Sequence, residues 1–374
     1  MIFDIDVHAH LIRQPRSNRL SFPDYLLDVY NHKPRSFYKN DMVKEVACFK
    51  TNELRIAYAT ARTLCSYHLD KKELYFDIIA SLLGHFNLIT RNNHQYLNLK
   101  SDRLKRLRDF SKTSRIGELA QGINYLFVQE RLNYPFIIDF HLFQEKSKKP
   151  ASHKKTPDFV TLNIDFSQIG LLESKGEAQK GFKITGKNGK LKEALVQLES
   201  ANWPSVNHLI PCCVRFEEDI SSLKSGIHYS KIRKKQIKNS ELQLRMFKQH
   251  FASWFYLVGD FTRASILIDG GNIENLENDE RYEIGTDDKA EKIYWLKRPI
   301  SINFDIEGEK SSIHLYTHFI HQNDFNIGIY ESVITQIVRG NLDNKTFPFS
   351  INSEGNYKRF ADGTLIRLSS NIYD

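Results

Sequence analysis

The chain has 374 residues, of which 41% are hydrophobic, with 53 lysines and arginines against 45 acidic residues and a net charge of +8. This length predicts two or three domains with hydrophobic cores, and no run approaches the roughly 18 uninterrupted apolar residues of a membrane span. The four cysteines show no CxxC spacing and the start lacks a basic leader with an apolar run, which together predict a cytoplasmic protein without disulfides or structural zinc.

Residues 1–110 are predicted to be mainly helical after a short opening strand, since residues 40–69 and 71–85 carry apolar residues every three or four positions. The opening strand contains Asp6, His8 and His10. Histidines two apart on a strand face the same way and can chelate zinc, and this segment resembles the strand end of amidohydrolase barrels. Such a barrel needs eight strand-helix units, an alternation that the sequence does not show.

Two basic runs interrupt the chain, and the net positive charge favours a polyanionic partner. The first run, 101–110, is predicted to be helical, and the second begins a predicted long helical region over 231–256. Either run can be a solubilising helix face or a set of contacts to the phosphate backbone. The candidate nucleic-acid-binding residues are Arg103, Lys105, Arg106, Arg108, Lys231, Arg233, Lys234, Lys235 and Lys238.

Between the basic runs, the pattern predicts a compact α/β segment. A helix is expected over 114–131, with Ser114 as its N-cap, followed by a buried strand over 136–143 and a basic surface loop up to 155. A polar turn then joins two short apolar segments, 159–164 and 170–175, which predicts an antiparallel hairpin. An amphipathic helix over 191–199 and an apolar strand over 209–216 complete the segment.

The hairpin gathers two carboxylates and one ammonium. Glu173 and Lys175 are two residues apart on one strand and therefore share a face, and Asp158 opens the partner strand near them. Two carboxylates can hold Mg²⁺ and leave positions open for water and a phosphate oxygen. The metal offsets charge on a phosphoryl group, and a nearby lysine can orient water or add positive charge. An ordinary surface ion pair between Glu173 and Lys175 is the plain alternative.

Pro157-Asp158 followed by Glu173-Ser174-Lys175 resembles the signature of the PD-(D/E)xK nuclease superfamily. The resemblance implies a restriction-endonuclease-like core, a central mixed sheet flanked by helices in the order helix, three strands, helix, strand. It implies that Asp158 and Glu173 hold Mg²⁺, for which Mn²⁺ can substitute, and that Lys175 assists. It also implies a further acidic residue from the first helix, for which Glu118 fits, and support from Lys192 or Gln197 on the second.

The expected fold class is therefore α/β, with a mainly helical region over 1–110, the nuclease core over 111–216 and an α+β region over 217–374. The last region resembles no family we can name, and recognition or partner binding are its expected roles. Its aromatic residues near 247–255 are predicted to be core, and a hairpin is expected over 357–368.

By resemblance, the chain is expected to be a DNA endonuclease of restriction or anti-phage defence, in which water attacks phosphorus in line and leaves 5′-phosphate and 3′-hydroxyl ends. A partner protein of a defence complex fits this role, and a homodimer fits cleavage of both strands. Two alternatives stay open: a zinc hydrolase using Asp6, His8 and His10, and a non-catalytic DNA-binding subunit.

Overall fold

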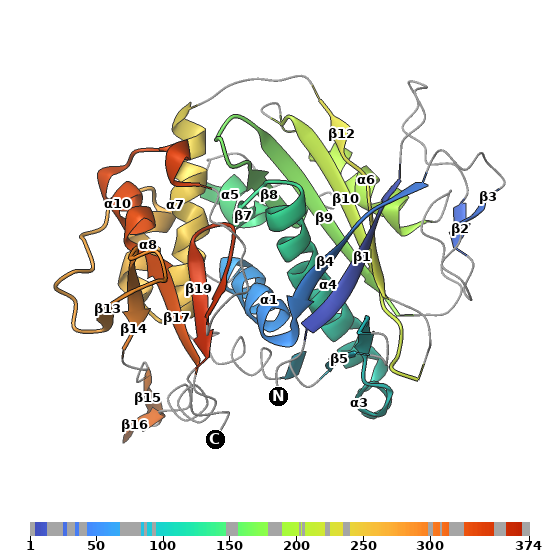
Figure 1. Cartoon of the computed structure of the whole chain (residues 1–374), viewed down its shortest axis with the longest axis horizontal. Coiled ribbons are helices and arrows are strands. Elements are labelled where there is room, and N and C mark those ends of the chain that lie inside the picture. Colours follow the sequence, from blue (N-terminus) through green and yellow to red (C-terminus); the bar gives the residue numbers. More distant parts are fainter. Residues whose placement is uncertain are drawn as a thin grey trace. The chain divides into compact units, whose positions relative to one another are not determined.

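The chain forms two compact units, residues 1–163 with 167–239 and residues 164–166 with 240–374, which we describe separately from a computed structural model (Figure 1). Among its described helices, none is both long and apolar enough to cross a lipid bilayer. The structure describes residues 4–12, 25–27, 34–36, 43–67, 84–85, 88–91, 95–146, 156–178, 189–201, 203, 206–220, 225–234, 240–297, 302–306, 309–313, 325–347 and 357–368.

The first unit is built on an eight-stranded mixed sheet with the order β4-β1-β11-β10-β9-β8-β7, and β12 pairs with β10. The two central neighbours β9 and β10 run parallel, as do β1 and β11, and the remaining pairs along this order are antiparallel. The strands are β1 (Asp4–Ile12), β4 (Val43–Asn52), β7 (Phe136–Asp139), β8 (Phe159–Leu162), β9 (Ile169–Glu177), β10 (His208–Arg215), β11 (Gly226–Tyr229) and β12 (Ile232–Arg233).

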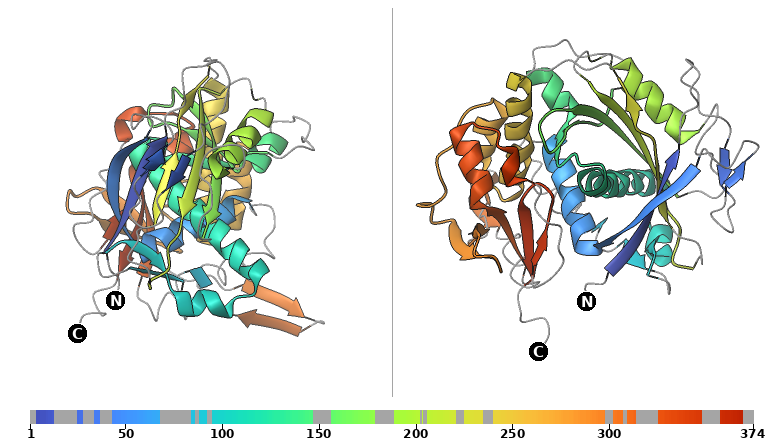
Figure 2. Two further views of the ribbon diagram at one scale, coloured as in Figure 1. Left: turned by 90° about the vertical axis from the view of Figure 1, so that its right-hand side faces the viewer. Right: turned by 45° about the horizontal axis from the view of Figure 1, so that its top comes forward.

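Helices cover both faces of this sheet, which explains why β8 and β10 are buried on both faces rather than alternating between buried and exposed residues. The sheet curls around α4 (Asp109–Arg131), while α6 (Lys190–Ser200) lies on the opposite face of β9 and β10 (Figure 2). Helix α1 (Glu53–Tyr67) packs along α4. The smaller elements are β2 (Tyr25–Leu27), β3 (Pro34–Ser36), β5 (Ile89–Arg91), β6 (Leu97–Leu99), α3 (Ser101–Arg106) and α5 (Phe140–Lys146).

The second unit contains a five-stranded antiparallel sheet with the order β13-β14-β17-β19-β18. Helix α7 (Ser240–Leu257) places Phe247, Phe251, Trp254 and Phe255 in its core, each without exposed surface. The other elements are α8 (Phe261–Ile268), β13 (Tyr282–Thr286), β14 (Lys292–Leu296), β15 (Ile302–Ile306), β16 (Glu309–Ile313), β17 (Phe325–Tyr330), α10 (Glu331–Arg339), a 3₁₀ turn η3 (Asn344–Thr346), β18 (Tyr357–Arg359) and β19 (Thr364–Leu368).

Several sequence predictions are confirmed. The α/β class holds, the hairpin appears as β8 and β9, and the following helix and strand appear as α6 and β10 within one residue of their expected bounds. The aromatic residues of α7 are core, and Gly363, with φ of 81°, turns the predicted β18–β19 hairpin. Cys212 and Cys213 are buried free thiols in β10, as expected.

Other predictions differ from the structure, and tertiary pairing explains the differences. The region expected to be mainly helical supplies β1 and β4 to the same sheet as β7–β10, so residue 110 does not separate two units. Ile232 and Arg233 form an edge strand against β10 instead of starting a helix. The strand expected over 136–143 ends at Asp139, because its carboxylate accepts the Leu142 N–H at 2.9 Å and so starts α5.

Helix α4 approaches its neighbours through glycines, and Gly122 gives the first prediction. A Cβ at Gly122 would lie 2.8 Å from the backbone nitrogen of Thr60 and 2.9 Å from its Cα, so α1 would have to move. We expect Gly122→Ala to lower the free energy of unfolding by about 1–3 kcal/mol. Thermal unfolding followed by circular dichroism measures this change.

Gly117, on the same helix, is the matched control, because a Cβ there meets nothing within 4 Å. Gly117→Ala should leave the midpoint unchanged or raise it, since alanine favours a helix by up to about 1 kcal/mol over glycine. Equal midpoints for the two variants would contradict the close packing of α1 on α4.

Candidate active site

The hairpin of β8 and β9 brings Asp158 and Glu173 together. Phe159 pairs with Leu172 in the antiparallel register, which sets the preceding Asp158 opposite Glu173. Each carboxylate accepts a hydrogen bond from the other strand. The Asp158 N–H donates to Glu173 Oε2 at 3.0 Å, and the Ser174 N–H donates to Asp158 Oδ2 at 2.8 Å. These reciprocal bonds hold both carboxyl groups at one position on the sheet.

Alternation along β9 decides which face carries the charges. Ser174 Oγ accepts a hydrogen bond from Asn124 Nδ2 on α4 at 2.7 Å, and Gly176 lies against the same helix. Glu173 and Lys175 therefore project from the opposite face, where α6 lies. Lys175 Nζ is 2.7 Å from Glu173 Oε1 and 3.7 Å from Glu193 Oε1 on α6, and Lys190 Nζ is 3.4 Å from Glu193 Oε2.

Burial dominates the electrostatics of the pair. Glu173 has no exposed surface, and its pKa is raised by this burial and further by the Asp158 carboxylate, against the lowering effect of Lys175. Burial likewise raises the pKa of Asp158, although the Ser174 N–H and Lys175 oppose it. Burial lowers the pKa of Lys175, but the carboxylates of Glu173, Asp158 and Glu193 together outweigh this effect, so the pKa of the ammonium stands above its ordinary value.

A further carboxylate, Asp139 at the end of β7, belongs to the same region. It is 5% exposed, and burial raises its pKa to about 7, with Asp158 adding to the increase and backbone hydrogen bonds from Leu142 and His141 reducing it. Among the described residues, ion pairs join Glu173 and Glu193 to Lys175 and Lys190, and Asp158 and Asp139 add two further carboxylates to the same region. Counted over these six described residues, the cluster has two negative charges in excess when all groups are ionised.

That excess suits a divalent cation. Asp158 and Glu173 are hard oxygen ligands held side by side, and Mg²⁺ commonly takes one or two carboxylates and completes its coordination with water and phosphate. A cation bound to both carboxylates would also offset the repulsion from Asp158, which adds to the effect of burial in raising the pKa of Glu173. Within the described residues, no three His, Cys, Asp or Glu side chains are gathered as a metal-ligand group.

The helix residues predicted to support the site are placed as follows. Glu118 lies on α4, across β9 from Lys175, where its carboxylate lies 2.8 Å from His85 Nε2 and 2.8 Å from Ser114 Oγ. Gln197 is buried on α6, and its Nε2 donates to the Thr156 carbonyl at 3.4 Å, two residues before Asp158. Lys192 is half-buried on α6.

Sequence reasoning missed Glu193, Lys190 and Asp139. Glu193 and Lys190 were within the predicted helix over 191–199 or next to it, but a helical periodicity does not reveal which polar residue meets a strand. Asp139 stood inside a segment interpreted as a buried strand. A carboxylate within an apolar run was the available signal, because a buried charge needs a partner.

The predicted nucleic-acid-binding residues lie on the surface where the structure describes them. Arg103, Lys105 and Arg106 are exposed on α3, and Arg108 is exposed just before α4. Lys231, Arg233 and Lys234 are exposed at β12, and Lys231 Nζ lies 4.8 Å from the centre of the Tyr134 ring. Lys235 and Lys238 lie outside the described residues.

The histidines of the opening strand lie in the mixed sheet. Strand β1 pairs with β4 and with β11, and each histidine contacts an aromatic ring. His8 meets Tyr96 edge to face at 5.2 Å between ring centroids, and His10 stacks on His228 at 5.0 Å. These ring contacts give both histidines a packing role.

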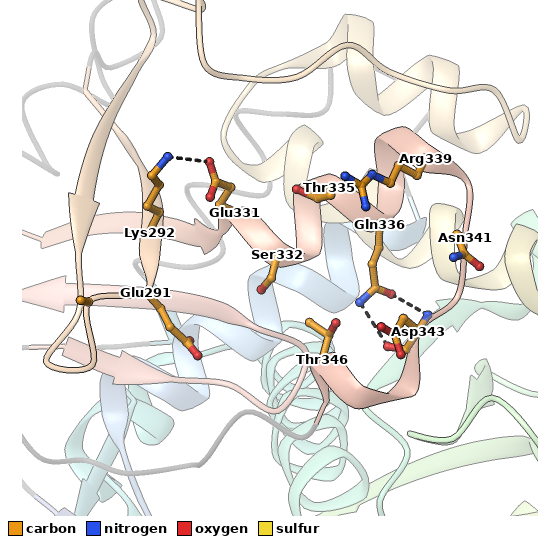
Figure 3. A pocket seen from close by; sticks show the side chains of 11 residues that line it. Glu291, Lys292, Glu331, Ser332, Thr335, Gln336, Arg339, Asn341, Asp343 and Thr346 are labelled. Atoms are coloured by element: carbon orange, nitrogen blue, oxygen red, sulfur yellow. Dashed lines mark hydrogen bonds and ion pairs between the residues drawn. The ribbon is translucent and has the colours of Figure 1, made fainter.

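The second unit has a polar cavity of about 470 Å³ beside α10 (Figure 3). Its charged side chains include both signs: Lys292 Nζ lies 3.4 Å from Glu331 Oε1, and Gln336 exchanges hydrogen bonds with the backbone of Asp343. The lining carries three acidic and two basic side chains, and this mixture of signs does not specify a ligand class. The lining residues are Ala290, Glu291, Lys292, Glu331, Ser332, Thr335, Gln336, Arg339, Asn341, Asp343 and Thr346.

Comparison with family models, curated proteins and solved structures found no match to this chain. Function therefore has to be inferred from the geometry of the Asp158, Glu173 and Lys175 cluster.

The raised pKa of Asp139 gives a second prediction, on stability against pH. The folded state holds a proton that the unfolded chain releases above the ordinary value of 3.8, so stability is lost as pH rises toward about 7. We expect wild type to lose stability relative to Asp139→Asn across this window, with a slope of at most about 1.4 kcal/mol per pH unit. Urea unfolding in the presence of a chelator measures the difference, and parallel curves would contradict it.

Proposed function

We propose that this protein is a Mg²⁺-dependent nuclease that hydrolyses phosphodiester bonds in DNA, with Mn²⁺ able to substitute. The observation that carries the proposal is the cluster of Asp158, Glu173 and Lys175 on adjacent strands, with Lys175 Nζ 2.7 Å from Glu173 Oε1. Phosphodiester hydrolysis requires stabilisation of negative charge on the phosphoryl group, and a divalent cation with an ammonium group supplies it.

The arrangement of elements supports a restriction-endonuclease-like core. Along the chain, α4 is followed by β7, β8 and β9, then α6 and β10, which is the order that the PD-(D/E)xK resemblance implies, except that the short helix α5 lies between β7 and β8. Strands β7, β8 and β9 form an antiparallel meander, and α6 leads to β10, which runs parallel to β9. Of the proposed metal ligands, Asp158 directly precedes β8 and Glu173 lies within β9, the positions that the resemblance implies.

In the proposed site, Asp158 and Glu173 hold the cation. When bound, Mg²⁺ supplies Lewis-acid stabilisation of the phosphoryl oxygens and lowers the pKa of coordinated water. Lys175 is 20% exposed, so its ammonium can reach a bound phosphate or water while its pairing with Glu173 keeps it charged. Glu193 and Lys190 on α6 position Lys175 from the other side. Burial of Glu173 keeps bulk water from weakening these interactions.

The choice of DNA as substrate rests on the surface charge of the chain together with the resemblance. The exposed cations of α3 and β12 can contact the phosphate backbone without reading sequence. A role in restriction or anti-phage defence, a partner protein and a homodimer that cuts both strands are consistent with this proposal and follow from the resemblance alone.

Cleavage of supercoiled and linear DNA is the third prediction and the test of the site. Wild type should cut with Mg²⁺ or Mn²⁺, whereas Glu173→Gln and Lys175→Met should lose at least about 100-fold in rate, because the first removes a charged ligand of the cation and the second removes the ammonium beside the phosphoryl group. Both substitutions approximately preserve side-chain volume, so the variants should retain DNA binding, as measured by fluorescence anisotropy in a chelator.

Glu145, exposed near the end of α5, provides a matched control, and Glu145→Gln should cut like wild type. Equal rates for wild type, Glu173→Gln and Lys175→Met would refute this site. A wild-type chain that cuts neither substrate with either cation would refute nuclease activity of the isolated protein.

Salt dependence of DNA binding is the fourth prediction. For duplex DNA, the slope of log K against log salt should fall by about 0.9 for every phosphate that a variant no longer neutralises. Replacing Arg103, Lys105, Arg106 and Arg108 by glutamine should therefore flatten the slope and weaken binding at low salt. As a control, glutamine should replace four exposed cations of the second unit, which should change neither the salt slope nor the affinity at low salt. These cations are Lys289, Lys297, Arg339 and Lys345. Identical slopes for both quadruple variants would contradict a specific role of the first run.

A further inference from the structure

The first two turns of α4 expose a large aromatic side chain. From Asp109 to Arg115 no residue of the helix is buried, and the first buried residue is Ile116. Phe110 lies in this segment with 86% of its surface exposed, the largest fraction among the exposed large hydrophobic residues that the structure describes. Since burying a phenylalanine side chain is worth about 1.5–3 kcal/mol, this ring has apolar surface available for a ligand.

The sequence on both sides of this ring is basic. Residues 100–112 contain six lysines and arginines against two aspartates, Asp102 and Asp109. Asp102 lies 3.8 Å from Arg103, so it offsets one of the cations. The Asp219 carboxylate accepts the Ser101 N–H at the start of α3, which places an acidic group at this border of the surface. The six basic residues are Lys100, Arg103, Lys105, Arg106, Arg108 and Lys112.

The segment that carries Phe110, formed by α3 and the start of α4, is anchored to the rest of the first unit. Leu104 of α3 is 1% exposed, so the short helix is fixed from beneath. Its N-terminus is tied to the segment after β10, since the Leu99 N–H donates to the Glu217 carbonyl at 2.8 Å and the Ser101 N–H donates to Asp219 Oδ1 at 3.1 Å. Phe110 therefore lies on a backbone segment that is fixed by these contacts.

An aromatic ring among cations matches the two parts of a nucleic-acid strand. Phosphates pair with lysine and arginine, and unpaired bases stack on exposed aromatic rings, an arrangement typical of single-strand binding. A paired base inside a duplex offers no free π-face to the ring. A purely apolar protein partner would have to desolvate the flanking cations without pairing them, which is costly.

We propose that the surface formed by α3 and the first turns of α4 binds single-stranded nucleic acid, with a base stacked on Phe110 and phosphates on the flanking arginines and lysines. This inference rests on the proposed nuclease function and specifies its substrate: a strand with unpaired bases next to, or in place of, duplex. Phe110 is thus a specificity determinant for strand state rather than part of the cleavage chemistry.

The fifth prediction tests this surface by binding alone. Full-length protein carrying Lys175→Met, in a chelator, is titrated against a labelled oligothymidine of about 20 nucleotides and against a matched duplex. Phe110→Ala should weaken oligothymidine binding by about 5- to 150-fold, the value of one base–aromatic stack, and should change duplex binding less than about twofold. Phe110→Trp should bind oligothymidine with the same affinity as protein that keeps Phe110. The fluorescence of the added tryptophan should be quenched by the oligonucleotide.

Ile284→Ala, at a half-exposed apolar position of the second unit, is the matched control and should bind both ligands unchanged. Unaltered oligothymidine affinity in Phe110→Ala, or full affinity in Phe110→Leu, would overturn the stacking proposal. Phe110-dependent sedimentation with anionic vesicles, without Phe110-dependent oligothymidine binding, would overturn it in favour of a membrane surface. Because none of these measurements needs cleavage, they stand apart from the test of the active site.

Discussion

Close packing of α4 into the curve of the sheet is the constraint on which the first unit depends. Gly176 of β9 has no side chain because a Cβ would lie 2.7 Å from the Ile116 carbonyl oxygen, and Ser174 is hydrogen-bonded to Asn124 of the same helix. These contacts commit one face of β9 to α4. Strand alternation then commits Glu173 and Lys175 to the other face, toward α6. The close contact between α4 and one face of β9 therefore determines that the charged cluster lies on the other face of β9.

The cluster is electrostatically costly by itself. Glu173 is buried beside a second carboxylate, and Lys175 offsets only part of the charge, while Glu193 and Lys190 extend the ion pairs onto α6. A structural role would be served better by an apolar pair of the same volume. Retaining buried carboxylates with raised pKa values is typical of sites that bind a cation or transfer charge, and this is the physical basis for interpreting the hairpin as functional.

Aromatic residues contribute to the two units in different ways. In α7, Phe247, Phe251 and Trp254 are fully buried, so none is available to stack on a base. Phe110 is the opposite case, a nearly fully exposed ring on a helical turn that lacks buried residues. The neighbouring residues in the sequence are basic. An ordinary solvated helix face would explain these charges, but it would not explain an exposed aromatic ring among them.

The sequence by itself determined the hairpin, the helix and strand that follow it, and the pairing of Asp158 with Glu173 and Lys175, because these depend on local periodicity and on neighbouring strands. Only the tertiary structure decided that residues before 110 add β1 and β4 to the same sheet, that Ile232 joins β10, and that Glu193 and Asp139 approach the cluster. Glu118 shows what the sequence could not determine. Its helix was predicted, but the sequence did not reveal which face of β9 this helix covers. Long-range pairing and helix rotation depend on packing between distant segments, which no local pattern contains.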